Sequence, residues 1–177
     1  MSPILLPSAQ QPEPDLADQH SHETQISLFT RHSGNPILSR KHWPYPVNSV
    51  FNAGAVLLAD GETLLLCRVE DRRGLSHLTV ARSANGVDGW RVDPAPTFPA
   101  EPRKFPDEIW GIEDPRITWV PELEQYAVAY TSFARGGPGV SLALTSDFRN
   151  FERYGVIMPP EDKVLLCYRE KSADTGL

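Results

Sequence analysis

The sequence has little of what marks membrane-spanning or disulfide-linked proteins. Only two of its 177 residues are cysteine, which is too few for a disulfide framework. No apolar run approaches the roughly 20 residues that a membrane-spanning helix needs. The first ten residues contain no basic residue, unlike the start of a signal peptide. We therefore expect a cytoplasmic, reduced protein that does not enter a membrane.

Positive charge and metal-ligand patterns are also scarce. The net charge of -6 argues against a nucleic-acid partner. The five histidines lack the spacing of metal ligands. No glycine-rich phosphate loop, nucleophile elbow or cysteine cluster occurs. The sequence thus predicts no metal and no cofactor.

The 17 prolines argue against long helices, and short apolar runs dominate instead. Residues 1–25 are rich in Pro, Gln, Ser, Asp and His and are expected to be disordered. Further on, Asp60-Gly61 separates two apolar runs, as in a hairpin turn. The predicted class is all-β. The expected strands lie at 51–59, 62–69, 76–82, 89–92, 116–120, 125–132, 140–145 and 151–157.

These runs form two sets of four that share one repeat. The pairs that lie 62 positions apart are Asn52 and Asp114, Leu64 and Tyr126, and Ala81 and Ala143. A four-strand repeat is typical of a β-propeller blade, and a propeller has about 4 to 8 blades. A β-sandwich with coincidental spacing stays open on these residues alone. About two blades are present and the chain stops where a third begins, so we expect a truncated propeller.

Two polar residues start the inner strands of the expected blades. Asn52 and Asp114 should therefore face one axial site. We expect Pro115 to hold Asp114 in an extended conformation. The like charge of Glu113 should raise the pKa of one of the two acids, as a general acid requires. The alternative is a simple turn with surface ion pairs.

A second cluster spans residues 68–74 and contains three arginines, which could clamp an anion. A solvated, charged hairpin turn is the alternative. Trp43, Tyr45 and Trp110 could stack on sugar rings, although burial in the core would explain them equally.

Together these pieces form an ordered series of motifs. They are Asn35-Pro36-Ile37-Leu38, Trp43-Pro44-Tyr45-Pro46-Val47-Asn48, Phe51-Asn52, residues 68–74 (RVEDRRG), 76–78 (SHL), 110–116 (WGIEDPR), Gly137-Pro138 and 147–153 (DFRNFER). From Phe29 to Lys163 the series resembles the N-terminal half of glycoside hydrolase family 130, which contains β-mannoside phosphorylases, β-1,4-mannosylglucose phosphorylases and related mannosidases. The resemblance favours the propeller over the sandwich.

The resemblance implies a five-bladed β-propeller, of which this chain holds about two blades. It also implies inverting phosphorolysis, in which inorganic phosphate attacks the anomeric carbon of a β-mannoside and α-mannose 1-phosphate is released. Asp114 then corresponds to the catalytic acid, which protonates the leaving oxygen through the 3-hydroxyl of the mannose. Asn52 and Arg68 correspond to residues that hold the mannose, and Arg73 to one that reaches the phosphate.

The resemblance ends after Lys163. We expect a partial propeller over residues 26–163 and a divergent tail over 164–177. A β-mannoside hydrolase, an inactive fragment and a sugar-binding module without catalysis are the alternatives. The sequence leaves open which mannoside is used, and a homo-oligomer remains among the options for assembly.

Overall fold

The computed structural model of the protein describes residues 28–158 and 160. The predicted tails, residues 1–25 and 164–177, lie outside these residues. The chain divides between Ser33 and Gly34. Residues 28–33 hold no helix or strand, and everything below concerns the unit that begins at Gly34.

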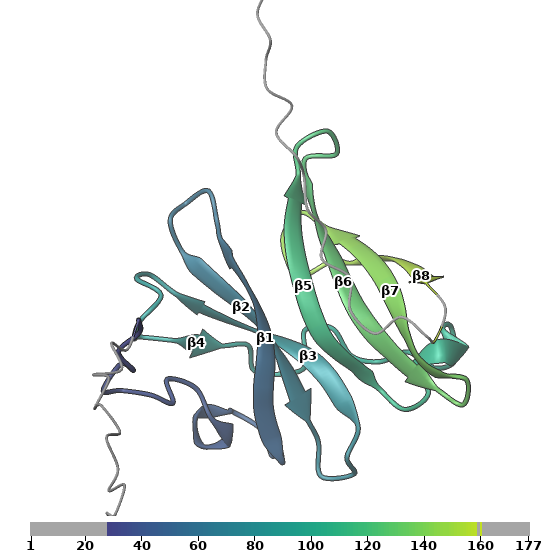
Figure 1. Ribbon diagram of the computed structural model, residues 1–177, viewed down its shortest axis with the longest axis horizontal. Coiled ribbons are helices and arrows are strands. Elements are labelled where there is room, and N and C mark those ends of the chain that lie inside the picture. The colour runs from purple at the N-terminus through teal and green to yellow at the C-terminus, as the bar shows by residue number, and fades with distance from the viewer. Residues whose placement is uncertain (1–27, 159, 161–177) are drawn as a thin grey trace, which may run out of the picture. The chain divides into compact units, whose positions relative to one another are not determined.

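Eight strands form two four-stranded antiparallel sheets, each in chain order (Figure 1). The first sheet contains β1 (Ser49–Leu57), β2 (Thr63–Glu70), β3 (Ser76–Ser83) and β4 (Arg91–Val92). The second contains β5 (Ile112–Val120), β6 (Gln125–Ala134), β7 (Gly137–Thr145) and β8 (Glu152–Met158). Two short 3-10 helices, η1 (Arg40–His42) and η2 (Pro106–Glu108), lie outside the sheets.

The sheets confirm the predicted class and all eight predicted strands. Each sheet is an uninterrupted meander, and no strand crosses from one sheet to the other. A Greek-key sandwich would exchange strands between its sheets. Consecutive four-stranded meanders are instead the construction of propeller blades. The inner strands β1 and β5 lie side by side in Figure 1.

The predicted repeat holds for β1 and β5 but is wrong by one residue for β2 and β6. Val56 pairs with Leu64, whereas Thr118, which lies 62 residues after Val56, pairs with Ala127. Counted between these equivalent pairs, the β5–β6 hairpin is therefore one residue longer than the β1–β2 hairpin. As a result Ala127, not Tyr126, is the counterpart of Leu64.

Apolar side chains fill the space between the two sheets. Those of β2 and β3 pack against those of β6 and β7, together with Phe98, Ile112 and Phe148. A second cluster, which includes Trp43 and Cys67, covers the opposite face of the first sheet. Both faces of the first sheet are therefore covered by apolar side chains. The buried members of the first cluster are Leu64, Leu66, Leu78, Val80, Phe98, Ile112, Tyr126, Val128, Tyr130, Ala143 and Phe148.

A buried ion pair anchors the proline-rich connection between the sheets. Glu108, in η2, is 1% exposed, and its carboxylate accepts hydrogen bonds from Arg153 of β8 at 2.5 Å and from the Tyr130 hydroxyl of β6 at 2.9 Å. The backbone N–H of Glu101 donates to the same carboxylate at 2.8 Å. A charge can stay buried only when it is paired in this way. The pair thus ties the connection to the second sheet immediately before β5 begins.

Removing one partner of this pair should destabilise the fold strongly. We expect Arg153→Met to lower the free energy of unfolding by about 3–5 kcal/mol, because Glu108 would be left as a buried, unpaired charge. Urea unfolding at pH 7 measures the loss. Arg149→Met is the matched control, since Arg149 is exposed, and it should change stability by no more than about 0.5 kcal/mol. Equal effects of the two substitutions would contradict a role for the ion pair.

Candidate active site

The site begins at two matching irregularities in the inner strands. The pairing of β1 with β2 shifts register between Phe51 and Gly54, and the pairing of β5 with β6 shifts between Glu113 and Arg116. Each irregularity is a β-bulge, which turns a strand locally and re-aims its side chains.

Asn52 and Asp114 are the residues that the bulges re-aim. Their φ values are positive, 46° and 49°. The prediction that Pro115 holds Asp114 extended was therefore wrong. The bulge requires left-handed backbone, and Asn and Asp are the non-glycine residues that adopt it most readily. The structure brings the two side chains together, as the repeat predicted, and Asn52 Nδ2 donates to Asp114 Oδ1 at 3.0 Å.

Arg68 joins the same group from β2. Its Nη1 donates to Asp114 Oδ1 at 3.0 Å and its Nη2 donates to Glu113 Oε1 at 2.8 Å. Its Nε donates to the Ser76 hydroxyl at 3.0 Å, and the guanidinium carbon lies 4.5 Å from the centre of the Phe51 ring. Every nitrogen of the guanidinium thus has a partner, so its plane is fixed.

The start of β5 is pressed closely onto β3. Gly111 forms a parallel bridge with Ser76, and a Cβ atom at Gly111 would lie 2.7 Å from both the backbone nitrogen and the backbone oxygen of Ser76. The φ of Gly111 is also positive, 101°. Only glycine fits here. This close approach lets Glu113 and Asp114 reach Arg68.

The local charges lower the pKa of Asp114 below its ordinary value. Partial burial pushes the pKa up, but the hydrogen bonds from Asn52 and Arg68 and the charges of Arg68 and Arg116 outweigh it. The prediction that Glu113 raises the pKa of one of the two acids is not met at Asp114. The negative charge of Glu113 is offset because Glu113 is itself paired with Arg68. Without a ligand, Asp114 is therefore a carboxylate at neutral pH.

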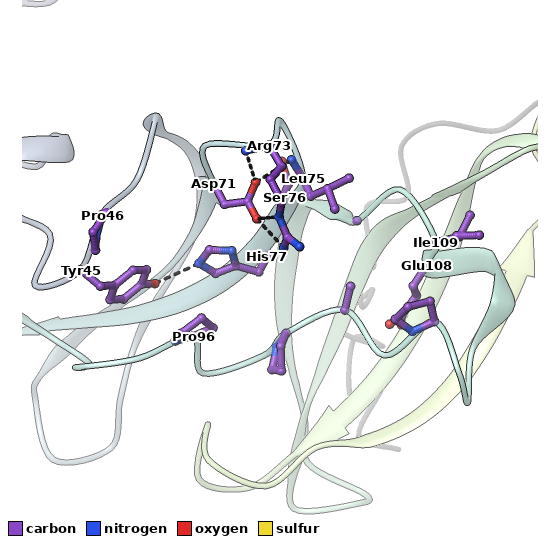
Figure 2. Close-up of a pocket in the computed structure, with 14 residues that line it drawn as sticks. Tyr45, Pro46, Asp71, Arg73, Leu75, Ser76, His77, Pro96, Glu108 and Ile109 are labelled. Atoms are coloured by element: carbon purple, nitrogen blue, oxygen red, sulfur yellow. Dashed lines mark hydrogen bonds and ion pairs between the residues drawn. The ribbon is translucent and has the colours of Figure 1, made fainter.

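Arg73 is paired with Asp71 rather than with the carboxylates that Arg68 binds. It sits on the turn between β2 and β3, where its guanidinium bonds to Asp71 at 2.7 and 2.9 Å, and its side chain is 77% exposed. The three arginines of the 68–74 cluster therefore do not form one clamp. Arg73 and Asp71 line a hollow of about 440 Å³ together with Tyr45, His77 and Ser76, and Ser76 is the hydrogen-bond partner of Arg68. Figure 2 shows these side chains around the hollow.

The three candidate stacking aromatics have different environments. Trp43 is buried in the core, as the alternative explanation proposed. The Tyr45 hydroxyl is bonded to His77 Nε2 at 3.0 Å and to the Thr79 hydroxyl at 2.6 Å. Trp110 is 42% exposed and packs edge-on against Phe133. Trp110 thus has the most open ring of the three.

Within residues 28–158, no three His, Cys, Asp or Glu side chains are grouped so that they could hold a metal ion. Over the same described residues, no helix has the length and apolarity to cross a membrane. The cytoplasmic location and the lack of a cofactor stay predictions.

Two consecutive four-stranded meander blades, whose inner strands meet at Asn52 and Asp114, define the class as a β-propeller. The sequence model of glycoside hydrolase family 130, described as β-1,4-mannooligosaccharide phosphorylase, matches residues 21–173. The chain belongs to this family. Family 130 proteins are five-bladed propellers, and this partial chain corresponds to two of the blades.

Known relatives are similar over part of their length. The β-1,2-mannobiose phosphorylase of Thermoanaerobacter sp. is 30% identical over 159 residues, which cover 78% of this chain and 50% of the relative. The β-1,2-mannobiose phosphorylase of Listeria innocua is 33% identical over 100 residues, which cover 55% of this chain and 26% of the relative. The chain thus spans half or less of these relatives.

A solved structure is similar in fold as well. It comes from work on family 130 glycoside hydrolases that target β-1,2 mannosidic linkages in Candida mannan. It is 26% identical with a TM-score of 0.62, and the match covers 71% of this chain and 40% of the solved one. The two sheets described above therefore have the arrangement found in this family.

Sequence reasoning missed three contacts of Arg68. Ser76 is eight positions away, on the facing strand β3, and Phe51 lies directly opposite Arg68 on β1. A hairpin register drawn through the turn at Gly74 would have placed Ser76 near Arg68. The contact with Glu113 had no such local indication, since 45 positions separate the two residues.

The lowered pKa of Asp114 makes a testable statement about stability. A depressed carboxyl pKa stabilises the fold above the unfolded value of 3.8, and this stability is lost as the pH falls through the folded value. We therefore expect Asp114→Asn to cost stability above about pH 5, and the cost to shrink toward about pH 3. Urea unfolding of both proteins across this range measures the difference.

The control places Asp114→Asn in an Arg68→Met background. Without the guanidinium, much of the pH-dependent difference should disappear. A difference that is the same with and without Arg68 would show that the ion pair does not set the pKa of Asp114.

Proposed function

We propose that the chain carries the acid-bearing part of a β-mannoside phosphorylase site. The observation that supports this most is that Asn52 and Arg68 both donate hydrogen bonds to one carboxylate oxygen of Asp114. The three residues come from three strands of two blades. An amide, a guanidinium and a carboxylate offer both donors and acceptors to the hydroxyls of a sugar ring. In this proposal Asn52 and Arg68 hold the mannose and Asp114 is the acid.

The ionised state of Asp114 is compatible with this role. A general acid must hold a proton when the leaving oxygen departs. A sugar hydroxyl that replaces the Arg68 hydrogen bond, together with the negative charge of phosphate nearby, would raise the pKa of Asp114. Substrate binding would thus let a carboxylate that is ionised in the free protein take up a proton from solvent.

The reaction needs only one protein carboxyl group. A phosphate oxygen forms the new bond to the anomeric carbon, the glycosidic bond breaks, and Asp114 supplies the proton to the departing oxygen by way of the mannose 3-hydroxyl. The configuration inverts, so a β-mannoside gives α-mannose 1-phosphate. Arg73, exposed on its turn, is the proposed contact for phosphate. No cofactor takes part.

The proposed substrates are β-linked mannooligosaccharides. The family model is described by a β-1,4 linkage and the curated relatives by a β-1,2 linkage, so both linkages are candidates. Hydrolysis is a second candidate, because the related solved structure comes from work on hydrolases of this family. An inverting hydrolase needs a second carboxylate to activate water, whereas phosphate is itself the nucleophile. Both curated relatives are described as phosphorylases, so phosphorolysis is the stronger proposal.

The test incubates the protein with β-1,2- or β-1,4-mannobiose, with and without inorganic phosphate. We expect α-mannose 1-phosphate only when phosphate is present, and a loss of about 10²–10⁴-fold in rate for Asp114→Asn. Free mannose released equally well without phosphate would favour hydrolysis. Mannose 1-phosphate release that survives Asp114→Asn would rule out Asp114 as the acid.

Asp60→Asn is the matched control. Asp60 lies on the turn after β1, where its side chain accepts a hydrogen bond from the backbone of Glu62. Asparagine can accept the same bond, so this variant should keep the parent rate.

Isothermal calorimetry with mannose adds a readout without turnover, and binding should weaken by about tenfold or more in Arg68→Met. A parent protein that neither binds mannose nor forms the phosphate would overturn the proposal.

A further inference from the structure

Arg68, Glu113 and Asp114 form one ion-paired group, and Glu113 is the member without a role in the proposed reaction. It precedes Asp114 on β5 and pairs with the other terminal nitrogen of the Arg68 guanidinium. The guanidinium is thus shared between two adjacent carboxylates. The side chains of Arg68, Glu113 and Asp114 are only 14%, 15% and 20% exposed, so solvent screens their charges incompletely.

Charges of both signs face Asp114. Asn52 from β1 contributes a neutral amide, Arg68 from β2 a positive charge, and β5 contributes both Glu113 and Arg116. Two carboxylates therefore oppose two guanidinium groups. Without Glu113, two positive charges would act on Asp114 alone, which would hold it as a carboxylate more firmly.

Glu113 also anchors Arg68 independently of Asp114. Both hydrogen bonds from Asn52 and Arg68 fall on the same oxygen of Asp114, Oδ1. A hydroxyl that binds at Oδ1 must compete with the bond from Nη1. When that bond breaks, Nη2 stays on Glu113 and Nε stays on Ser76. The guanidinium can then remain in place beside an occupied Asp114.

We propose that Glu113 is a positioning residue, whose carboxylate keeps Arg68 beside the sugar and offsets its charge, so that Asp114 can take up a proton. This role rests on the proposed function for its purpose, but its physical basis can be measured without any substrate. Glu113 itself does not touch the reacting atoms in this assignment.

The first test follows the Asp114 carboxyl carbon by NMR in protein labelled with ¹³C at aspartate side chains, with Asp114→Asn to assign the signal. In Glu113→Gln the titration midpoint of Asp114 should move to lower pH, because a like charge is removed while the shape is kept. Glu113→Asp keeps the charge and should stay closer to the parent. Glu122→Gln, on the turn at the other end of β5, should leave the midpoint unchanged.

Three outcomes would overturn the proposal. One is a midpoint in Glu113→Gln that is unchanged or moves to higher pH. Another is a shift in Glu122→Gln as large as that in Glu113→Gln. The third is loss of amide-signal dispersion in Glu113→Gln, which would make Glu113 a folding residue rather than a positioning one.

A second test separates binding from proton transfer. Glu113→Gln keeps a hydrogen-bond acceptor for Arg68, so its affinity for mannose, measured by calorimetry, should stay within about threefold of the parent. Glu113→Ala removes the anchor and should lose roughly tenfold. Equal losses in the two variants would contradict the proposal. If the parent does not bind mannose, the proposed function fails, whereas an unmoved Asp114 midpoint refutes the role of Glu113 alone.

Discussion

The guanidinium of Arg68 is the interaction on which the candidate site depends. It comes from β2 of the first sheet and bonds to two consecutive carboxylates of β5 in the second sheet. Charge-assisted hydrogen bonds of this kind are directional as well as strong, so they orient the groups they join. Because Ser76 and Phe51 fix the guanidinium plane, the first sheet acts as the reference that positions the acids of the second.

The two bulges make this meeting possible. A regular strand would alternate its side chains between the two faces of the sheet. The left-handed backbone at Asn52 and Asp114 interrupts that alternation at the same place in each inner strand and directs the two side chains toward each other. The same device, repeated in two blades, builds a site that belongs to neither blade alone.

Packing keeps the two sheets close enough for these bonds. Gly54 and Gly111 allow close backbone approaches that a Cβ atom would prevent. A Cβ atom would lie 2.8 Å from the backbone oxygen of Pro115 at Gly54 and 2.7 Å from the backbone of Ser76 at Gly111. The buried pair of Glu108 and Arg153 holds the connection that leads into β5. Core packing and site geometry are thus coupled, because packing sets the position of β5 and β5 carries Glu113 and Asp114 into the site.

The sequence by itself determined the features that depend on neighbouring residues. Short apolar runs predicted eight strands, Asp60-Gly61 marked a hairpin, and the repeat placed Asn52 and Asp114 at equivalent positions. Only the tertiary structure decided the backbone of Asp114, the direction of its pKa shift and the different pairing partners of Arg68 and Arg73. The partners of Asp114 lie 46 and 62 positions away, on β2 and β1. Their effect depends on how two sheets pack and where each strand bulges, and neither is encoded in a local run of residues.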